Sequence, residues 1–237
     1  MGSRTAVRWL EAFRAIRALV RDPDDTGQVF RVIRAFSDRT IERQLARFQA
    51  TPEGRRILAE NRSLLARLGD RAALEQLPPG SLGRAYADFT RVEEISPAGL
   101  VEASLAAPPE GETISPERRL FAERLRDSHD LWHVVTGYGR DLVGEAALLA
   151  FTYRQTRNPG IGLIVLAAWW KTGRDLPGAR ALIRDGLRRG SRAGWLPGAD
   201  WELLLTRPLE EVRRSLAIEP VAAYAQKRSA GAPVLAR

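Results

Sequence analysis

Cysteine is absent from this chain of 237 residues, and its absence narrows the chemistry that the chain can carry. Disulfides, thiolate metal ligands and thiol nucleophiles are all excluded together. Histidine is nearly absent as well, with two residues in the whole chain. A metal site in this protein must therefore use nitrogen and oxygen ligands, and any imidazole in it comes from those two histidines.

Long apolar runs are also missing. The longest, residues 161–170, falls well below the roughly 18 residues that span a bilayer as a helix. The opening segment 6–21 lacks the apolar block and the cleavage site of a secretory signal. It reads as an arginine-rich amphipathic core helix with one acid, Glu11, and the alternative is a transit peptide. We therefore expect no transmembrane helix and a cytoplasmic location.

Lysine is scarce, because Lys171 and Lys227 are the only two in the chain, so the formal charge of +8 rests almost entirely on arginine. The arginines are spread along the whole length and form no cluster with aromatic residues and no recognisable module. This distribution argues against nucleic acid as a partner. A basic surface does favour contact with anionic membrane lipid. The alternative explanation for the many arginines is a codon bias toward arginine, without any function.

Apolar residues recur at helical spacing through most of the chain, whereas the alternating pattern of strands is nearly absent. Breaks rich in proline and glycine at residues 78–80 and 158–160 separate the helices. The Ser-Pro pair at 115–116 is a strong helix start. We predict an all-α fold, a single-domain helical bundle over residues 1–237 with a loose tail from about residue 226. The predicted helices cover residues 6–21, 29–36, 40–50, 57–68, 81–89, 115–136, 141–155, 162–171, 178–189 and 208–216.

The two histidines, His129 and His133, lie four residues apart in one of these predicted helices. This spacing places both imidazoles on the same helical face, where they can converge on a single ion. Chance would rarely bring the only two histidines of a chain together in this way. The pair is therefore the first half of a predicted metal site.

The second half is Glu145, which lies twelve residues beyond His133, with Gly139 at the midpoint. If the chain reverses at that glycine, an antiparallel helix pair brings Glu145 level with His133. Gly144 would let the two helix backbones approach closely. Glu145 also shares its helical face with apolar residues, where a carboxylate is unfavourable unless it meets a cation or hydrogen-bond donors.

Asp130 completes the acidic part of the site, although it points about 100° away from His129 on an ideal helix. It either binds the ion directly or orients an imidazole from outside the ligand set. One divalent ion is expected, zinc first and iron or manganese as alternatives, with positions left for water or substrate. The structural alternative is that Glu145 pairs with Arg126 or Arg140. The predicted ligands are His129, Asp130, His133 and Glu145.

The pattern His-Asp-x-x-His at residues 129–133, followed after eleven residues by Glu145, resembles the motif of the ubiquinone (coenzyme Q) biosynthesis proteins of the Coq-four type. The likeness covers most of the chain, and the four motif positions show no departure from the family pattern. Surrounding stretches are similar as well, at residues 21–26, 135–139, 141–145 and 208–213.

This resemblance implies an all-helical metalloprotein of ubiquinone biosynthesis, peripheral to the inner membrane face of a bacterium. The implied activity is of the carboxy-lyase type: oxidative decarboxylation at ring carbon one of a polyprenylated hydroxybenzoate, in which a hydroxyl replaces the carboxylate. The metal would act as a Lewis acid, and hydroxylation with oxygen would need iron or another redox-active ion, since zinc leaves it unexplained. Implied partners are the prenylated quinone precursor, a membrane surface and other enzymes of the pathway; a homo-oligomer stays open.

Three alternatives bear on this interpretation. Metal-dependent phosphohydrolases with a His-Asp pair need another histidine upstream, and this chain has no third histidine. Zinc peptidases carry glutamate where this chain has Asp130, and the shorter side chain changes the reach to a bound water. A protein of a different class, a non-catalytic scaffold or prenyl-lipid-binding component, would use the metal to pin the helix pair. Residues 161–170 would then line a prenyl groove or touch lipid, although we read them as a buried core helix.

Overall fold

The structure is a computed structural model, and it describes residues 14, 31–33, 36, 38–96 and 114–228. These residues form helices and no strand, apart from an isolated bridge between Ser81 and Pro208, so the predicted all-α fold is confirmed. The predicted helix 6–21 and most of the predicted helix 29–36 lie outside the described residues, as does the end of the predicted tail.

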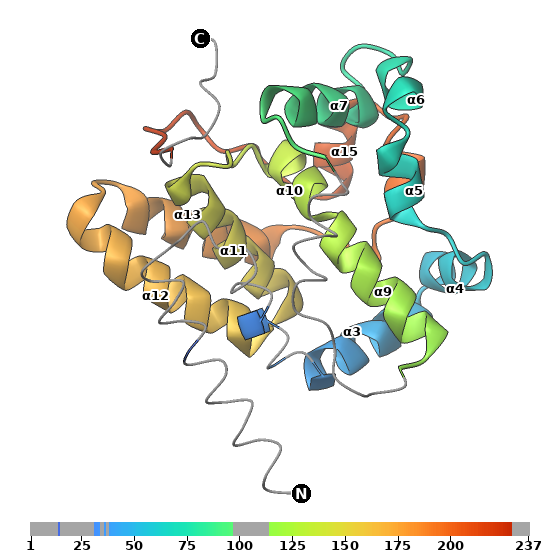
Figure 1. Cartoon of the computed structure of the whole chain (residues 1–237), viewed down its shortest axis with the longest axis horizontal. Helices are drawn as coiled ribbons and strands as arrows, with labels where there is room; N and C mark the ends of the chain where they lie inside the picture. The colour runs from blue at the N-terminus through green and yellow to red at the C-terminus, as the bar shows by residue number, and fades with distance from the viewer. Residues whose placement is uncertain (1–13, 15–30, 34–35, 37, 97–113, 229–237) are drawn as a thin grey trace, which may run out of the picture.

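The first half of the described chain contains short helices that surround one end of the molecule (Figure 1). The single helix predicted over residues 57–68 is wrong, because Asn61 adopts a positive φ of 46° and ends the first segment. The next helix begins afresh at Ser63, whose hydroxyl accepts a hydrogen bond from the Ala66 amide. The helices are α3 (Asp38–Ala50), α4 (Pro52–Ala59), α5 (Leu64–Gly69), α6 (Arg71–Glu75) and α7 (Leu82–Val92).

The second half contains the longer helices and the two histidines. The prediction of one helix over residues 115–136 is wrong, because the chain forms two helices that meet at Ser128. The Ser128 hydroxyl donates to the Leu125 carbonyl at 3.3 Å, a local bond that competes with regular helix geometry. Two further elements, η1 and α14, are too short to give a periodic signal and were not predicted. The elements are α9 (Pro116–Asp127), α10 (His129–Thr136), α11 (Leu142–Thr156), α12 (Pro159–Asp175), α13 (Ala179–Arg192), η1 (Leu196–Gly198), α14 (Trp201–Leu204) and α15 (Leu209–Ser215).

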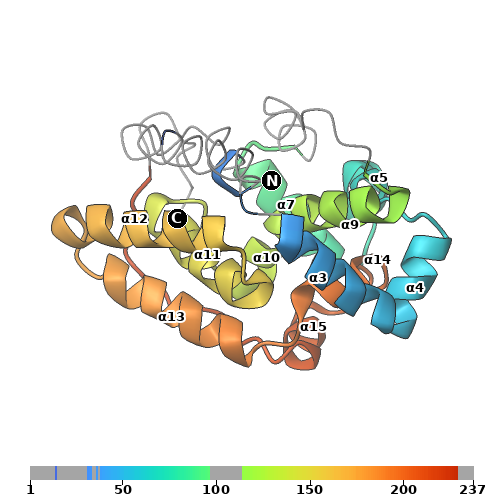
Figure 2. The ribbon, with the colours of Figure 1, turned by 90° about the horizontal axis from the view of Figure 1, so that it is seen from below.

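Helix α10 lies between two groups of helices and packs against both of them through the hydrophobic core. Helices α11, α12 and α13 pack on one another on one side, while α7 and α15 contact α10 on the other (Figures 1 and 2). The largest hydrophobic cluster joins the two groups: Trp132 of α10 meets Phe151 of α11 with ring centroids 6.2 Å apart. Because these aromatic residues are buried, the positions of α10 and α11 relative to each other are set by the core.

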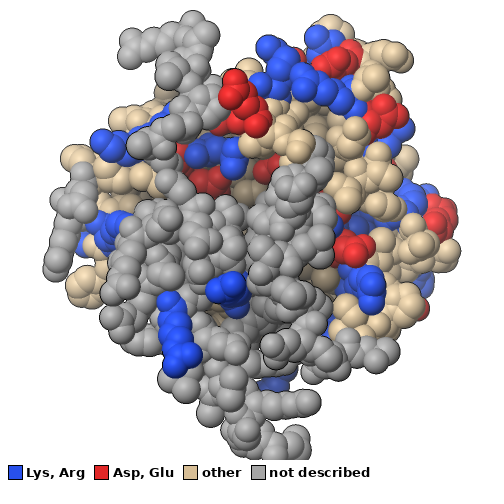
Figure 3. Space-filling view, in the orientation of Figure 1, with Lys and Arg blue, Asp and Glu red and all other residues tan. Residues whose placement is uncertain are grey.

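Helix α12 contains the apolar run 161–170, and only one of its faces is core. Ile161, Ile164 and Val165 are buried, whereas Leu166 and Trp170 are 53% and 62% exposed. The prediction of a buried core helix therefore holds for one face of α12 and is wrong for the face that carries Leu166 and Trp170. None of the described helices is long and apolar enough to cross a membrane. Over the described part of one face, basic and acidic side chains are interspersed (Figure 3), as the scattered arginines predict.

Candidate metal centre

The two histidines lie one turn apart on α10, with ring centroids 4.9 Å apart. The side chain of His133 is fully buried, and that of His129 is 29% exposed. The i, i+4 spacing thus brings both imidazoles to one face of the helix, as predicted. Helix α10 ends immediately afterwards at Gly137, whose φ of 79° is a left-handed conformation that favours glycine.

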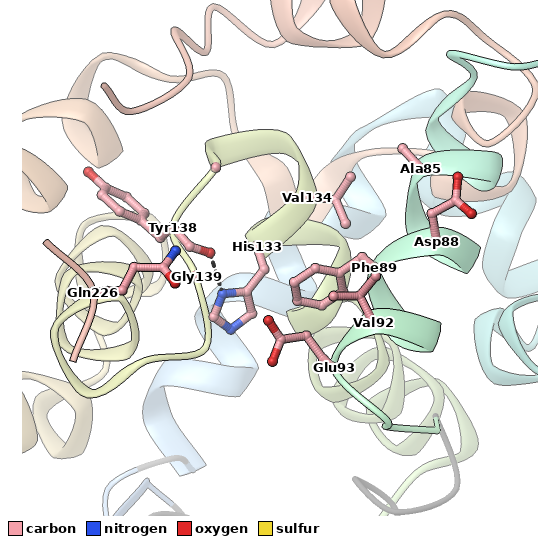
Figure 4. Close-up of a pocket in the computed structure, with 11 residues that line it drawn as sticks. Ala85, Asp88, Phe89, Val92, Glu93, His133, Val134, Tyr138, Gly139 and Gln226 are labelled. Carbon is pink, nitrogen blue, oxygen red and sulfur yellow. Dashed lines mark hydrogen bonds between the residues drawn. The ribbon is translucent and has the colours of Figure 1, made fainter. Parts of the chain in front are cut away.

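The turn after Gly137 fixes the orientation of the His133 ring. Its Nδ1 atom lies 2.8 Å from the carbonyl oxygen of Tyr138 (Figure 4). A carbonyl can only accept, so Nδ1 carries a proton, and in the neutral form of the ring Nε2 holds the lone pair that could bind an ion. That Nε2 atom is buried and makes no hydrogen bond to any of the described residues, and it lies 3.4 Å from Oε1 of Glu145, an ion-pair distance when the ring is protonated. An unsatisfied buried nitrogen beside a carboxylate is the arrangement that a cation would complete.

Glu145 reaches the histidines from the first turn of α11. Its Oε2 lies 3.9 Å from Nε2 of His129, so the predicted meeting of Glu145 with both rings is present in the structure. Arg140 also lies near this carboxylate, with Nε 3.7 Å from Oε1 of Glu145. The second arginine considered as a partner, Arg126, pairs instead with Asp127 at 2.7 Å.

The prediction for Gly144 needs a correction. A Cβ atom at this position would lie 2.2 Å from the carbonyl oxygen of Gly139 and 2.3 Å from the hydroxyl of Tyr224. Position 144 therefore requires glycine because a side chain would collide with the turn and with Tyr224. The predicted reason, a close approach of the α10 and α11 backbones, is wrong. The sequence could not reveal this contact, because Tyr224 lies 80 residues further along the chain.

Asp130 is buried, and its Oδ1 lies 3.2 Å from Nδ1 of His129. This contact leaves Nε2 of His129 facing Glu145. The nitrogen and oxygen atoms that His129, Asp130 and His133 can offer to an ion lie within 4.8 Å of one another. Asp130 therefore lies where it can serve in either of its two predicted roles, as a direct ligand or as the group that orients the His129 ring from outside the ligand set.

Each charged group of the cluster is stabilised by the others. Burial opposes the charged form of Glu145, but His133, His129 and Arg140 outweigh it and lower the pKa of Glu145 to about 2. Burial likewise opposes protonation of His129, yet the Asp130 and Glu145 carboxylates raise the pKa of His129 above its ordinary value. The carboxylates are therefore ionised at neutral pH, as metal ligands must be.

The donor set fits a divalent ion. Two imidazole nitrogens and one or two carboxylate oxygens suit zinc, iron or manganese. The orphaned Nε2 of His133 is the observation that favours an ion over simple packing, because a buried nitrogen without a partner is otherwise unfavourable. The pairing of Glu145 with Arg140 is too long for a hydrogen bond at 3.7 Å, so it does not satisfy the carboxylate by itself.

A pocket of about 400 Å³ opens beside His133, between α7 and the turn after α10 (Figure 4). The ring of Phe89 stacks on His133, with centroids 5.7 Å apart and an interplanar angle of 23°. Glu93 caps the carboxyl end of α7, and its buried carboxylate pairs with Arg228 at 3.0 Å. No sequence pattern indicates that Phe89 or Tyr138 belongs to the site, because Phe89 comes from a distant helix and Tyr138 acts through its backbone carbonyl.

Comparison with known proteins places this site in a family. Residues 4–222 match the model of the family described as Coenzyme Q (ubiquinone) biosynthesis protein Coq4. The ubiquinone biosynthesis protein COQ4, mitochondrial, of Yarrowia lipolytica is 29% identical over 170 residues, which is 71% of this chain and 62% of that protein. The Neurospora crassa protein of the same description is 30% identical, over 71% of this chain and 47% of its own length.

An insect relative and a solved structure extend the comparison. COQ4 homolog 1, mitochondrial, of Culex quinquefasciatus is 30% identical over 76% of this chain and 62% of that protein. This chain thus spans about three fifths or less of the length of these relatives. The crystal structure of a candidate ubiquinone biosynthesis protein from Nostoc punctiforme matches with a TM-score of 0.64 and 22% identity, over 87% of this chain and 96% of that one, and shows the same fold.

These relatives also correct one expectation. The sequence was read as that of a bacterial protein, cytoplasmic and peripheral to the inner membrane face. That prediction is wrong, because the curated relatives are named as mitochondrial proteins of fungi and an insect. The family match covers far more than half of the residues, and it includes all four motif positions. The chain therefore belongs to the Coenzyme Q (ubiquinone) biosynthesis protein Coq4 family.

Proposed function

We propose that this chain is a metal-dependent enzyme of ubiquinone biosynthesis that acts in the oxidative decarboxylation, at ring carbon one, of a polyprenylated hydroxybenzoate. The observation that carries the proposal is the buried, unpartnered Nε2 of His133, which faces Glu145 while Nδ1 is held by the Tyr138 carbonyl. His129, His133 and Glu145 would hold the ion, and Asp130 would orient His129. The bound ion would supply Lewis-acid stabilisation of developing negative charge.

The residues around the pocket support a ring-shaped substrate. Phe89 and Val92 give it an apolar side, and a volume of about 400 Å³ lies in the range of small-molecule sites. Phe89 stacks on His133, so an aromatic ring in the pocket would lie close to the histidines. Arg140, partly exposed beside Glu145, provides a positive charge for a carboxylate substituent.

The overall conversion has to balance with named co-reactants. When the carboxylic acid group is replaced by a hydroxyl, the ring compound takes up one dioxygen, two electrons and two protons, and it releases carbon dioxide and water. Dioxygen and a two-electron reductant are therefore co-substrates of the proposed reaction. This requirement favours iron over zinc among the ions that the donor set fits.

The test uses the purified full chain loaded separately with zinc, iron or manganese, with metal content measured by elemental analysis. A prenylated hydroxybenzoate is then supplied with dioxygen and a reductant, and carbon dioxide and the hydroxylated ring are followed by mass spectrometry. We expect turnover by the iron-loaded wild type and none by the H133A variant. Full conversion by H133A without bound metal would overturn the proposal. A protein that binds metal tightly but converts nothing would support the scaffold function instead.

A membrane surface is the second partner that we propose, and α12 provides the contact. Leu166 and Trp170 are the exposed apolar residues of this helix. The guanidinium groups of Arg180 and Arg184 lie 5.5 and 5.6 Å from the ring of the adjacent Trp169. Tryptophan and leucine beside arginine form a combination that suits the interface of an anionic bilayer. We also propose that this chain contacts other enzymes of quinone biosynthesis.

A further inference from the structure

Residues 218–228, which we call the strap, run back over the turn that joins the two helices of the metal centre (Figure 1). The strap follows α15 and contains no helix or strand. Its backbone is nevertheless hydrogen-bonded to residues on both sides of the turn. The Val221 amide donates to the Thr136 carbonyl at 2.8 Å, at the end of α10. The Leu142 amide, at the start of α11, donates to the Lys227 carbonyl at 2.9 Å. The strap therefore connects the last residue of α10 to the first residue of α11.

Tyr224 is the centre of this connection. Its hydroxyl donates to Oδ2 of Asp141 at 2.6 Å and accepts from the Gly139 amide at 2.9 Å. Asp141 is fully buried, and its Oδ1 also accepts from the Lys227 amide at 3.1 Å. The backbone approaches Tyr224 so closely at Gly144 that no side chain would fit there. Such a fully partnered carboxylate in the interior fixes the positions of the groups that surround it.

Two ligand positions depend on this arrangement. The Tyr138 carbonyl, one residue before Gly139, binds Nδ1 of His133, so Nε2 is the ring nitrogen that faces the site. Asp141 caps α11 by accepting from the Val143 and Gly144 amides at 3.1 and 3.3 Å. Glu145 projects from that same first turn. A change at Tyr224 would therefore alter the position of His133, through the turn at residues 137–141. It would also alter the position of Glu145, because Asp141 caps the helix that carries it.

We propose that Tyr224 is a positioning residue of the metal centre: by holding Asp141 and Gly139 together, it fixes the His133 tautomer and the place of Glu145. The inference rests on the proposed function, because it assumes that these residues hold an ion. The strap reaches the pocket as well, since Gln226 lines it and Arg228 pairs with Glu93 of α7. Residues near the predicted start of a loose tail thus belong to the functional site.

The test compares Y224F, which removes only the hydroxyl, with Y153F as a matched control. Tyr153 lies on α11 with its ring against Gly162, about 12 Å along the helix from Glu145. We expect Y224F to lower metal affinity by roughly 10- to 100-fold, the usual effect of losing a partner outside the ligand set. Y153F should leave the affinity unchanged. Affinities are measured by competition with a chelator for zinc and for manganese.

A second measurement separates positioning from simple loss of stability. The chain has only two histidines, so the ¹⁵N spectrum of the metal-free protein shows each imidazole separately. The wild-type spectrum should show His133 with the proton on Nδ1, and Y224F should show a mixture of tautomers while circular dichroism stays helical. D141N, which keeps an acceptor oxygen for Tyr224, should give an intermediate spectrum.

The outcomes for the two proposals are distinguishable. If the wild type binds no ion, the proposed function fails, whatever the variants do. If the wild type binds an ion and Y224F binds it equally well with an unchanged His133 tautomer, the positioning role of Tyr224 is overturned. If Y224F is less stable to heat but equal in affinity and spectrum, Tyr224 is only structural, and the inference fails in the same way.

Discussion

The Nε2 atom of His133 lies 3.4 Å from Oε1 of Glu145, across the interface of α10 and α11. Twelve residues separate these side chains in the sequence, and the left-handed Gly137 with the turn behind it brings them together. The nitrogen is buried and the carboxylate is ionised, so Nε2 of the ring and the negative charge of Glu145 face the same point.

Glu145→Gln should weaken metal binding by more than the roughly 10- to 100-fold typical of groups outside the ligand set. The amide keeps the size of the side chain but removes the charge that faces both imidazoles. Glu53→Gln, at an exposed position on α4, is the matched control and should bind as the wild type does. Isothermal titration with zinc measures both. Equal affinity of the Glu145 variant would remove Glu145 from the predicted ligands.

Metal affinity should rise with pH up to and beyond the ordinary imidazole value of about 6.5. The pKa of His129 is raised despite its burial, chiefly by Asp130 and Glu145, so a proton competes with the ion over a wider pH range. Asp130→Asn should lower that pKa and shift the rise in affinity to lower pH. An apparent dissociation constant measured at each pH reports the shift. If the variant instead loses affinity at every pH, Asp130 is a direct ligand.

Phe89→Leu should raise KM for the prenylated hydroxybenzoate by roughly 2- to 10-fold, because an aromatic contact contributes about 0.5–1.5 kcal/mol beyond its buried area. The ring of Phe89 stacks on His133 and lines the pocket. The metal content of the variant should match that of the wild type, since Phe89 offers no ligand atom. An unchanged KM with normal metal content would show that the ring binds elsewhere.

Replacing both Leu166 and Trp170 with serine should reduce binding to anionic vesicles by roughly 10-fold or more, because burial of one large apolar side chain is worth about 1.5–3 kcal/mol. Both residues are exposed on α12, so the melting temperature should change little. Leu203→Ser, at a similarly exposed position on α14, is the control. Co-sedimentation with vesicles measures the bound fraction. Equal losses in the control would show that the α12 face has no special role.

The sequence predicted the all-α fold and the meeting of His129, His133 and Glu145 because both depend on local spacing, whereas the bounds of several helices were wrong. His129 and His133 are four residues apart, so the helical repeat places them on one face. A single reversal of the chain then brings Glu145 close to both. The position of Tyr224 could not be predicted in this way, because it meets Asp141 only through the tertiary path of the strap. The break at Ser128 was missed for a related reason, since a hydroxyl bond to the preceding turn leaves the apolar pattern of α9 and α10 continuous.

The strap also bears on when the site can form. Chains fold progressively from the amino terminus during synthesis, and α10 and α11 leave the ribosome well before residues 224–228. Until then Asp141 lacks the Tyr224 hydroxyl and the Lys227 amide. The bonded turn between α10 and α11 can therefore form completely only after residues 224–228 have been synthesised, and a chain cut before Tyr224 would lack both of these bonds to Asp141.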